Sequence, residues 1–349
     1  MCFIHIIKVS VLIRIFFMIK LPVSISYFCK ALNKIMLKIG VIGAGELGET
    51  HVKVLKSLAA FELVGIYDVN HDSAIAIANQ YGIPTFNNVE DLMKLVDVVD
   101  IVKPRESHFE YAVKAMRLSK HVFIEKPVTN TLEEARKLLS LSEEANVKVQ
   151  VGHVERFNPA FRAALPFISH PMYIESHRMI EYDAQKENIP VVLDLMSHDL
   201  DIILSVVNAN IKNIKATGVE VIGNTPDVVN AIVEFDNGCV ANLSASRISL
   251  KNERVTKFFQ KDAHIKIDYL KKETSLFSLT ENGKRTICSK NIEIIDENPI
   301  QTELEEFAKS IINNTTPIVG ILDGYLMLDA AYKVAEKLNY PGVLTKVSA

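Results

Sequence analysis

Three glycines have the spacing of a site for a phosphate-linked ligand. They lie in the run Gly43-Ala-Gly-Glu-Leu-Gly48, between an apolar, strand-like segment and a segment whose apolar residues recur at helical spacing. The first glycine would permit a tight turn, Gly45 would let the backbone approach a pyrophosphate, and Gly48 would let helix and strand pack closely. Free N–H groups at the start of that helix would attract phosphate oxygens. The spacing predicts a dinucleotide site; a glycine turn that binds nothing is the alternative.

Asp68 indicates which dinucleotide the site would prefer. It directly follows the predicted strand at 61–67 and lies about 20 residues beyond the last glycine, where the group that holds the adenine ribose is expected. Its carboxylate can accept hydrogen bonds from both ribose hydroxyls and would repel a 2′-phosphate, and no arginine follows it closely. We therefore predict NAD rather than NADP. The predicted cofactor contacts are Gly43, Gly45, Glu46, Leu47, Gly48, Asp68, Pro104, His108 and Glu125.

Lys126, Asp194 and His198 are candidates for the chemistry of alcohol oxidation. Lys126 follows the predicted strand at 122–125 and precedes a proline, so it lies on a constrained turn at the edge of the cofactor site. An ammonium there can hydrogen-bond a reacting hydroxyl and stabilise alkoxide character as hydride leaves. Asp194 and His198 are spaced i, i+4, so a helix would place both on one face. A carboxylate beside an imidazole raises its basicity, which suits removal of a hydroxyl proton.

These residues allow other interpretations. Lys126 could be a solvated loop lysine, and the run from 191 to 204 could be an ordinary amphipathic helix in which His198 pairs locally. Asp194, His198 and Asp201 could also bind a metal, but no cysteine or second nearby histidine completes a zinc site. We favour catalysis and predict no metal site.

The elements that would position these residues alternate between strands and helices in the first half of the chain. Helices are predicted between consecutive strands at lengths typical of a doubly wound parallel sheet. Ligands of such a sheet bind at the carboxyl ends of its strands, where Gly43, Pro104 and Lys126 all fall. The predicted strands are 37–42, 61–67, 84–86, 98–102, 122–125 and 148–152, and the predicted helices after the first are 73–81, 89–95, 109–118 and 131–146.

The second half is richer in predicted strands. Asp236-Asn-Gly238 is a strong hairpin signal between two of them. Phe258, Phe259 and Phe277 are predicted to be core or oligomer surface, because no basic cluster accompanies them as nucleic-acid binding would require. The predicted strands are 172–180, 214–222, 228–235, 239–247, 255–260 and 263–269.

Composition narrows the class of protein. The chain has 349 residues, enough for two domains, and its formal net charge of −3 gives no general attraction to nucleic acid or anionic lipid. The four cysteines are scattered without a CxxC pair, which predicts a reducing compartment and a cytoplasmic location.

The first 35 residues are an exception in composition, since they are apolar and lack acidic side chains. Lys8, Arg14 and Lys20 interrupt the apolar run, so it contains no uncharged stretch of about 18 residues that could span a bilayer. Met36 lies just before the first predicted strand, where a dinucleotide-binding protein would begin. We favour a misassigned upstream start over a targeting segment; a genuine extension would allow a membrane-tethered protein.

Three motifs together resemble the glucose–fructose oxidoreductase/inositol dehydrogenase (Gfo/Idh/MocA) family: the glycine run, Glu125-Lys126-Pro127, and the run from Asp194 to Asp201. The resemblance covers about residues 38–340 and includes the late segments ELEEFAKSI and DGYLMLDAA. It implies a Rossmann domain followed by an α/β domain whose open, mostly antiparallel sheet shapes the substrate pocket and often mediates oligomerisation as dimers or tetramers. It also implies that Lys126 is the active-site lysine, His198 the acid/base and Asp194 the second polar residue.

The resemblance leads to predictions about domains and substrate. We predict an extension at 1–35, a dinucleotide-binding domain at 36–153 and a substrate and oligomerisation domain at 154–349. The segment from Gly152 to Pro159 resembles the branch that oxidises the 3-hydroxyl of UDP-N-acetylglucosamine. Arg156 could then face a diphosphate and Asn158 sugar hydroxyls, with Arg178 as a further substrate contact. A linker in which Arg156 makes a structural ion pair is the alternative.

Two departures from the family pattern leave other substrates open. The turn after the fourth predicted strand reads Lys103-Pro104-Arg105 instead of threonine or valine, proline, threonine, which would place two cations near the nicotinamide. The segment after Arg178 also lacks an arginine expected to help hold a nucleotide sugar. A dehydrogenase of inositol or a free sugar, or a non-catalytic dinucleotide-binding regulator, therefore remains an alternative.

Overall fold

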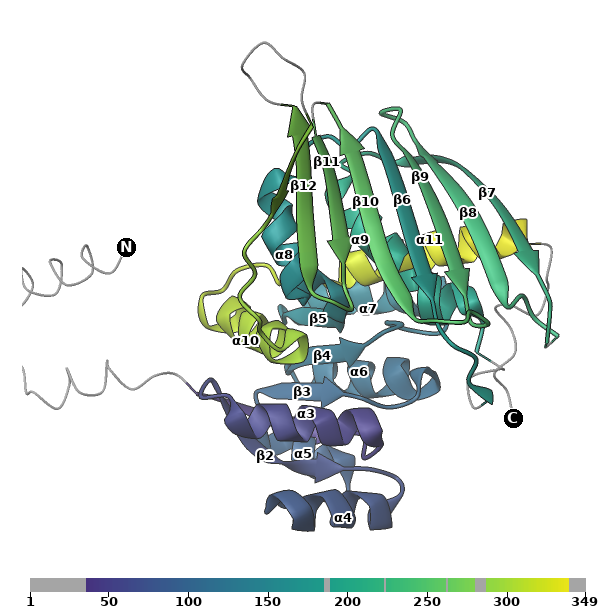
Figure 1. Ribbon diagram of the computed structural model, residues 1–349. Coiled ribbons are helices and arrows are strands. Elements are labelled where there is room, and N and C mark those ends of the chain that lie inside the picture. Colours follow the sequence, from purple (N-terminus) through teal and green to yellow (C-terminus); the bar gives the residue numbers. More distant parts are fainter. Residues whose placement is uncertain (1–35, 185–188, 223, 262, 280–286, 339–349) are drawn as a thin grey trace, which may run out of the picture. The chain divides into compact units, whose positions relative to one another are not determined.

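The computed structural model describes residues 36–184, 189–222, 224–261, 263–279 and 287–338 (Figure 1). Our interpretation of residues 1–35 lies outside the described residues. Among the helices described, none combines the length and apolar character needed to cross a membrane.

The first half folds as a five-stranded parallel sheet in the order β2-β1-β3-β4-β5, with helices between the strands (Figure 1). This confirms the doubly wound prediction. The predicted strand at 84–86 is reduced to an isolated bridge between Ile66 and Thr85. The strands are β1 (Leu37–Ile42), β2 (Phe61–Tyr67), β3 (Val98–Ile101), β4 (His121–Glu125) and β5 (Val149–Gly152). The helices are α3 (Glu46–Ser57), α4 (His71–Tyr81), α5 (Val89–Leu95), α6 (His108–Arg117, after the 3₁₀ turn η1, Arg105–Ser107) and α7 (Leu132–Glu144).

Local sequence explains the limits of these helices. Thr131 caps α7 by accepting a hydrogen bond from the Glu134 N–H, and the Glu134 carboxylate accepts the Thr131 N–H in return. This reciprocal arrangement is a capping box, and a threonine followed three residues later by a glutamate is its typical sequence pattern. Asn70 caps α4 by accepting a hydrogen bond from the Ser73 N–H, and Gly82 ends the helix in the left-handed conformation.

The second half forms a larger sheet in the order β13-β12-β11-β10-β6-β9-β8-β7. The β6–β9 pair is parallel and the other pairs are antiparallel. Its strands are β6 (Tyr173–Met179), β7 (Ile211–Val219), β8 (Val228–Phe235), β9 (Val240–Ser246), β10 (Glu253–Gln260), β11 (Ala263–Asp268), β12 (Glu273–Leu279) and β13 (Ile287–Asn291). The six predicted strands are confirmed within a few residues, whereas β12 and β13 were missed.

The two faces of this sheet differ. Along β8 buried and half-buried residues alternate, and Phe258 of β10 is fully buried in the core. On the opposite face a ladder of rings crosses four strands: Tyr173, Phe259, His264 and Phe277, with centroids 5.7, 4.3 and 5.0 Å apart in that order. Phe258 is therefore core, whereas Phe259 and Phe277 belong to the other face. Between β8 and β9, Gly238 has a positive φ of 89°, as the predicted hairpin requires.

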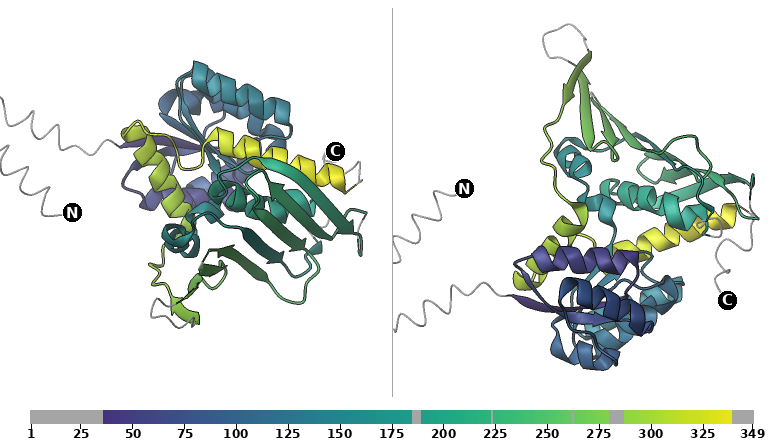
Figure 2. Two further views of the ribbon diagram at one scale, coloured as in Figure 1. Left: turned by 90° about the horizontal axis from the view of Figure 1, so that it is seen from above. Right: turned by 60° about the horizontal axis from the view of Figure 1, so that its bottom comes forward.

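The last two helices return to the parallel sheet (Figure 2). Phe307 of α10 (Pro299–Ile312) packs in the same core as β1, and its ring centroid lies 6.1 Å from that of Phe123 on β4. Before α11 (Ile321–Lys337), the Val319 carbonyl accepts a hydrogen bond from the Val151 N–H of β5. Residues from the end of the chain thus complete the parallel-sheet half.

Candidate active site

The glycine loop has the geometry of a pyrophosphate cradle. Gly43 has φ +129°, and a Cβ there would lie 2.3 Å from the Val102 carbonyl oxygen. A Cβ on Gly48 would lie 2.1 Å from the Gly43 carbonyl oxygen, so close packing of helix on strand requires this glycine. A Cβ on Gly45 would meet nothing within 4 Å among the described residues, and no side chain caps the α3 N-terminus there. Backbone N–H groups are thus free to face an anion.

The neighbouring cofactor candidates Glu46 and Leu47 are exposed on the first turn of α3, and Pro104 is exposed at the end of β3. Their surroundings are compatible with a dinucleotide lying along this edge of the sheet, where the carboxyl ends of β1 and β3 meet. Their contacts with a cofactor stay a prediction.

Asp68 is buried and accepts three hydrogen bonds. Its donors are the Ala44 N–H at 2.7 Å, the Asn70 N–H at 2.9 Å and the Lys103 ammonium at 2.9 Å. Burial opposes ionisation, but the Lys103 hydrogen bond and the backbone donors together lower the pKa of Asp68. Asp68 is thus held as a carboxylate with a cation beside it.

The Lys103 contact corrects one expectation. Lys103 was expected near the nicotinamide, but its ammonium reaches the predicted ribose site instead. Arg105 forms an ion pair with the adjacent Glu106 at 3.3 Å. The long lysine side chain can reach Asp68 because β1 lies between β2 and β3, which brings the ends of all three strands together.

His108 lies between two of the turns that border the candidate site. It is buried, with Nδ1 2.9 Å from the Pro127 carbonyl oxygen and Nε2 2.7 Å from the Lys103 carbonyl oxygen. Since both ring nitrogens face backbone carbonyls, the imidazole ties the turn after β3 to the turn after β4. This arrangement suits a residue that positions the two turns, and a contact between His108 and a cofactor stays a prediction.

Glu125 also faces inward. Its carboxylate accepts the Lys126 N–H at 3.1 Å and lies 3.3 Å from His51 Nε2, and a Cβ on Gly152 would collide with it at 2.7 Å. Burial opposes protonation of His51, but Asp100 and Glu125 raise its pKa well above the ordinary value. Below the candidate site, Glu125 therefore belongs to a buried charged cluster with His51 and Asp100.

Lys126 and the segment around Asp194 come together from the two halves of the chain. The Lys126 ammonium donates to the Asp194 backbone carbonyl at 2.9 Å, and lies 4.0 Å from the Asp194 carboxylate. Burial lowers the pKa of Lys126, while the charges of Asp194 and Glu125 partly offset that effect. An ammonium of this kind can donate hydrogen bonds to a substrate oxygen.

The predicted helix around His198 begins with a different geometry. Residues Val192–Met196 form a π-helical turn, η5, that continues into α9 (Ser197–Val206). A π turn has i→i+5 bonds, so the i, i+4 geometry assumed for Asp194 and His198 does not hold. His198 Nδ1 is buried without a hydrogen-bond partner in the described part of the chain.

The expected effect of Asp194 on His198 is wrong. Burial lowers the pKa of His198 well below its ordinary value, and the positive charges of Lys126 and Arg178 lower it further, with smaller contributions from His153 and Arg254. The imidazole is therefore neutral near pH 7 and has a lone pair available to accept a proton. This is the protonation state that a general base needs.

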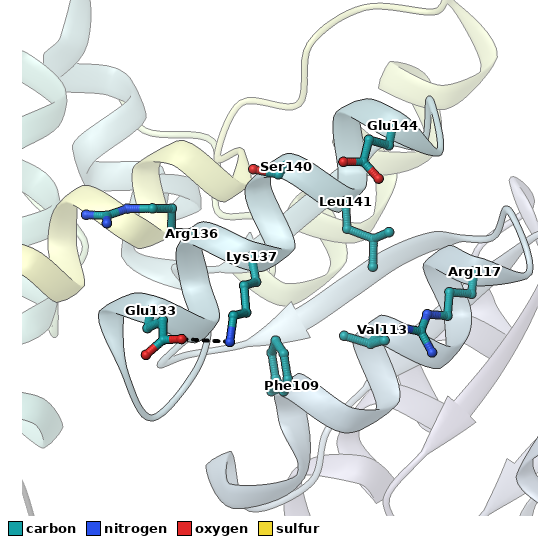
Figure 3. Close-up of a pocket in the computed structure, with 9 residues that line it drawn as sticks. All are labelled: Phe109, Val113, Arg117, Glu133, Arg136, Lys137, Ser140, Leu141 and Glu144. Atoms are coloured by element: carbon teal, nitrogen blue, oxygen red, sulfur yellow. Dashed lines mark ion pairs between the residues drawn. The ribbon is translucent and has the colours of Figure 1, made fainter.

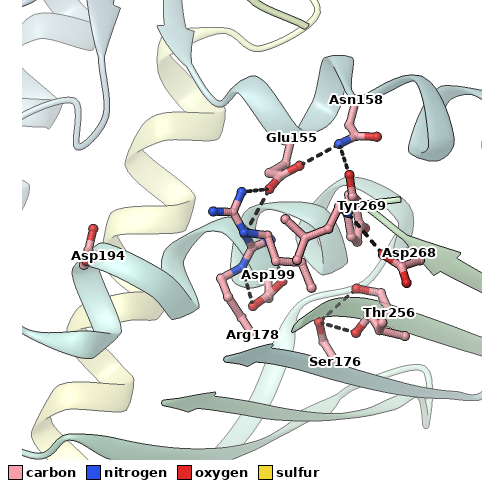
Figure 4. Close-up of polar contacts among 12 residues, drawn as sticks. Glu155, Asn158, Ser176, Arg178, Asp194, Asp199, Thr256, Asp268 and Tyr269 are labelled. Carbon is pink, nitrogen blue, oxygen red and sulfur yellow. Dashed lines mark hydrogen bonds and ion pairs between the residues drawn. The ribbon is translucent and has the colours of Figure 1, made fainter. Parts of the chain in front are cut away.

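Two of the three predicted substrate contacts, Arg178 and Asn158, lie in a buried network instead (Figure 4). Arg178 binds Asp199 through two hydrogen bonds of 3.1 Å and Glu155 through one of 2.9 Å. Asn158 caps α8 (Pro159–Ala164) and donates to the Glu155 carboxylate and the Tyr269 carbonyl. Figure 4 shows Asp194 apart from this network. Arg178 and Asn158 are thus structural in this conformation.

Arg156 makes structural ion pairs, which was the alternative to a contact with the substrate. Its guanidinium donates to both oxygens of Asp201, at 2.7 and 2.9 Å, and to Asp323 of α11 at 3.3 Å. With its donors used in this way, Arg156 has no free fork for a diphosphate. The same contact removes Asp201 from the metal-site alternative, and no cluster of three or more His, Cys, Asp or Glu suited to a metal occurs among the described residues.

Sequence reasoning missed two residues of the site. His153 directly follows β5 and is buried, with neither ring nitrogen hydrogen-bonded among the described residues, and burial lowers its pKa. Its position at the carboxyl end of a strand was the signal available. Arg254, on β10, had no such signal, because only the strand pairing brings it next to Arg178.

A separate groove runs between α6 and α7 (Figure 3). Phe109, Val113 and Leu141 give it an apolar lining, and Glu133 and Lys137 form an ion pair at 2.7 Å along one side. These side chains come from helices and not from the loops that carry the candidate cofactor and catalytic residues. We therefore do not assign this groove to the active site.

Comparison with known proteins agrees with this architecture. Residues 37–153 match an oxidoreductase family with an NAD-binding Rossmann fold, GFO/IDH/MocA, and residues 166–265 match the C-terminal domain of the same family. The chain belongs to the GFO/IDH/MocA family. The family membership predicted from the sequence is thereby confirmed, as is the combination of a Rossmann-type sheet with a second, mostly antiparallel sheet.

Several members of the family are similar over most of their length. UDP-N-acetylglucosamine 3-dehydrogenase of Acidithiobacillus ferrooxidans is 30% identical over 304 residues, which cover 86% of this chain and 96% of that protein. The scyllo-inositol 2-dehydrogenase (NAD(+)) of Bacillus subtilis is 29% identical, with coverage of 84% and 91%.

A solved structure of the first enzyme, GnnA, matches with a TM-score of 0.84 at 29% identity, covering 89% of this chain and 100% of that chain. A levoglucosan dehydrogenase in complex with NADH and L-sorbose shares the fold, with a TM-score of 0.78 at 18% identity and coverage of 86% and 96%.

Proposed function

We propose that this protein is an NAD-dependent dehydrogenase that oxidises a secondary hydroxyl of a sugar or nucleotide sugar. The observation that carries the proposal is the meeting of Lys126, from the turn after β4, with the segment that leads into His198. The positive charge of Lys126 contributes to the low pKa of His198, so the two groups act on each other electrostatically. A regulator that only binds a dinucleotide needs neither group.

The chemistry divides between the two side chains. The bound dinucleotide supplies the hydride acceptor. The Lys126 ammonium donates a hydrogen bond to the reacting oxygen and stabilises negative charge that develops on it. Neutral His198 accepts the hydroxyl proton. Asp194 keeps the ammonium in place through its backbone carbonyl and its nearby carboxylate.

NAD is the proposed cofactor because Asp68 is an ionised acceptor at the expected ribose position. The fit rests on three features: the open space above Gly45, the uncapped start of α3, and the Asp68 carboxylate. A cytoplasmic, homo-oligomeric protein remains our proposal, with the aromatic ladder Tyr173–Phe259–His264–Phe277 as the surface for a second copy.

UDP-N-acetylglucosamine, oxidised at its 3-hydroxyl, is the first substrate to test, since it is named for the relative at 30% identity. Inositols and free sugars form the second group, after the inositol dehydrogenase relative. The full chain would be incubated with NAD and each compound while NADH absorbance is followed. Binding of NAD without turnover of any compound would contradict the dehydrogenase proposal and favour the regulator.

Lys126→Met tests the proposed chemistry. Loss of the hydrogen-bond donor should lower kcat by about 10²- to 10⁴-fold, while NAD binding measured by fluorescence changes little. Lys137→Met is the matched control, because Lys137 lies exposed on α7 in an ion pair with Glu133. Turnover by Lys126→Met at the unaltered rate would remove Lys126 from the mechanism.

A further inference from the structure

Arg254 is an arginine near the candidate active site whose guanidinium is not saturated by carboxylates. It is the second residue of β10 and pairs directly with Arg178 of β6, so both side chains point to the same face of the sheet. Arg178 is buried and bound by both Asp199 and Glu155, whereas the Arg254 side chain is 41% exposed. Two arginines therefore lie side by side, with only one of them fully paired.

The nearest acidic group does not satisfy Arg254. Its Nη1 lies 3.5 Å from Glu155 Oε1, the oxygen that already accepts a shorter hydrogen bond, of 2.9 Å, from Arg178. The Arg254 Nε is buried and has no hydrogen-bond partner among the described residues. A buried N–H without an acceptor is unfavourable, so a ligand oxygen placed there would be stabilised.

Arg254 also acts on the groups that carry the proposed chemistry. Its positive charge contributes to lowering the pKa of both Lys126 and His198. The other cations of this region are engaged: Arg178 with Asp199 and Glu155, and Arg156 with Asp201 and Asp323. An anion that approaches Lys126 and His198 would thus meet Arg254 as an open, charged donor.

We propose that Arg254 selects substrates that carry a phosphate group by binding the phosphate oxygens while the sugar hydroxyl lies at Lys126 and His198. This inference rests on the proposed dehydrogenase function and narrows its substrate class from sugars in general to phosphorylated or nucleotide-linked sugars. Guanidinium and phosphate match in charge and in planar, two-point hydrogen-bond geometry. Arg254 is a specificity residue in this scheme, because it binds the substrate away from the reacting atoms.

The test compares Arg254→Gln with the unaltered protein on three substrates at saturating NAD. UDP-N-acetylglucosamine and N-acetylglucosamine 1-phosphate carry phosphate, whereas N-acetylglucosamine is neutral. For each protein, kcat/KM for a phosphate-bearing substrate is divided by kcat/KM for the neutral sugar. We expect this ratio to be about 10- to 100-fold lower in Arg254→Gln, mainly because KM for the phosphate-bearing substrate rises. A fall with UDP-N-acetylglucosamine alone assigns Arg254 to the nucleotide diphosphate, and a fall with both assigns it to a phosphate shared by the two. An unaltered ratio for both overturns the proposal.

Two further variants keep the result interpretable. Arg254→Lys retains the positive charge but not the two-point hydrogen-bond geometry. Its preference for phosphate-bearing substrates over the neutral sugar should therefore lie between that of Arg254→Gln and that of the unaltered protein. Arg162→Gln is the matched control, because Arg162 is 40% exposed and forms an ion pair with Glu297 on the surface. Its ratio should equal that of the unaltered protein, and thermal unfolding would verify that each variant is folded.

Direct binding separates this inference from the proposed function. Calorimetric titration of the NAD-loaded protein with UDP does not require turnover. If no sugar is oxidised but UDP binding is weakened at least tenfold by Arg254→Gln, the dehydrogenase proposal fails and the phosphate site stands. If sugars are oxidised but UDP binds the unaltered protein and Arg254→Gln equally, or binds neither of them, the proposed phosphate site is wrong and the dehydrogenase proposal stands.

Discussion

At the scale of single residues, the protonation states of Lys126 and His198 decide what the candidate site can do. Burial lowers the pKa of both groups below its ordinary value. For Lys126 the charges of Asp194 and Glu125 partly offset that effect, whereas for His198 the surrounding positive charges add to it. A neutral imidazole and an ammonium can then coexist near neutral pH, one as proton acceptor and the other as hydrogen-bond donor.

The pH dependence of kcat/KM should report these shifts. His198 acts as a base only when it is neutral, so activity should be lost only when the pH falls well below about 6.5, the ordinary histidine pKa. Lys126 can stabilise negative charge on the reacting oxygen only when it is protonated, so activity should decline on the alkaline side below about pH 10.5. A profile measured from pH 5 to 10 would check both limbs. An acid limb centred at or above pH 6.5 would contradict the assignment of His198, and the acid limb should disappear in His198→Asn.

The pair of Asp68 and Lys103 should determine whether the protein prefers NAD or NADP. Asp68→Ser would remove the carboxylate and leave the Lys103 ammonium, now unpaired, at the expected ribose position. The ratio of kcat/KM with NAD to that with NADP should fall about tenfold or more, because a 2′-phosphate would then meet a cation instead of an anion. Asp72→Ser, in the exposed first turn of α4, serves as control. An unaltered ratio would show that Asp68 does not discriminate between the two cofactors.

At the scale of elements, α10 brings an acidic side chain into the core, where it interacts electrostatically with Glu125 and His51. Glu303 is fully buried, and neither carboxylate oxygen has a hydrogen-bond partner in the described part of the chain. Burial raises its pKa well above the ordinary value, and the charge of Glu125 adds to that effect. Glu303 is therefore protonated in the folded protein at pH values where the unfolded chain has lost the proton.

This difference predicts how stability depends on pH. From about pH 4.5 up to the raised pKa, the unfolded state binds fewer protons, so the free energy of unfolding should fall by as much as about 1.4 kcal/mol per pH unit. Glu303→Gln should lose this slope and be more stable than the unaltered protein at pH 7.5. Urea unfolding at pH 5.5 and 7.5 would measure it, with Glu305→Gln, on the less buried side of α10, as control. Equal slopes in the two proteins would mean that Glu303 is ionised in the fold.

At the scale of the whole molecule, Arg156 links three segments that are far apart in sequence. It binds Asp201 of α9 and Asp323 of α11 from the turn η2 (Val154–Phe157), which follows the parallel sheet. Asp201 is almost completely buried, so its negative charge depends on this partner.

Arg156→Ala should therefore affect stability more than substrate binding. Leaving the Asp201 carboxylate buried and unpaired should lower the free energy of unfolding by about 3–5 kcal/mol. Arg162→Ala, which breaks an exposed pair with Glu297, should lower it by no more than about 1 kcal/mol. Denaturant unfolding would measure both. A stable Arg156→Ala protein with a raised KM would restore Arg156 as a substrate contact.

The sequence alone determined the features that depend on neighbouring residues. The glycine run, the capping box of α7 and the hairpin at Gly238 each arise from backbone geometry within a few residues, so their patterns were sufficient. The regular alternation of strands and helices likewise fixed the parallel sheet. β12 and β13 were missed because neither segment shows a clear apolar pattern of its own.

Only the tertiary structure decided which partner each charged side chain takes. Lys103 and Asp68, Arg156 and Asp323, and Arg178 and Glu155 meet through sheet order and helix return, which a linear pattern does not encode. The same is true of the low pKa of His198, because burial and cations from distant parts of the sequence, Lys126 and Arg178, lower it. Electrostatic environment is a property of packing, so the sequence identified the candidate catalytic residues but not their protonation states or the paired arginines around them.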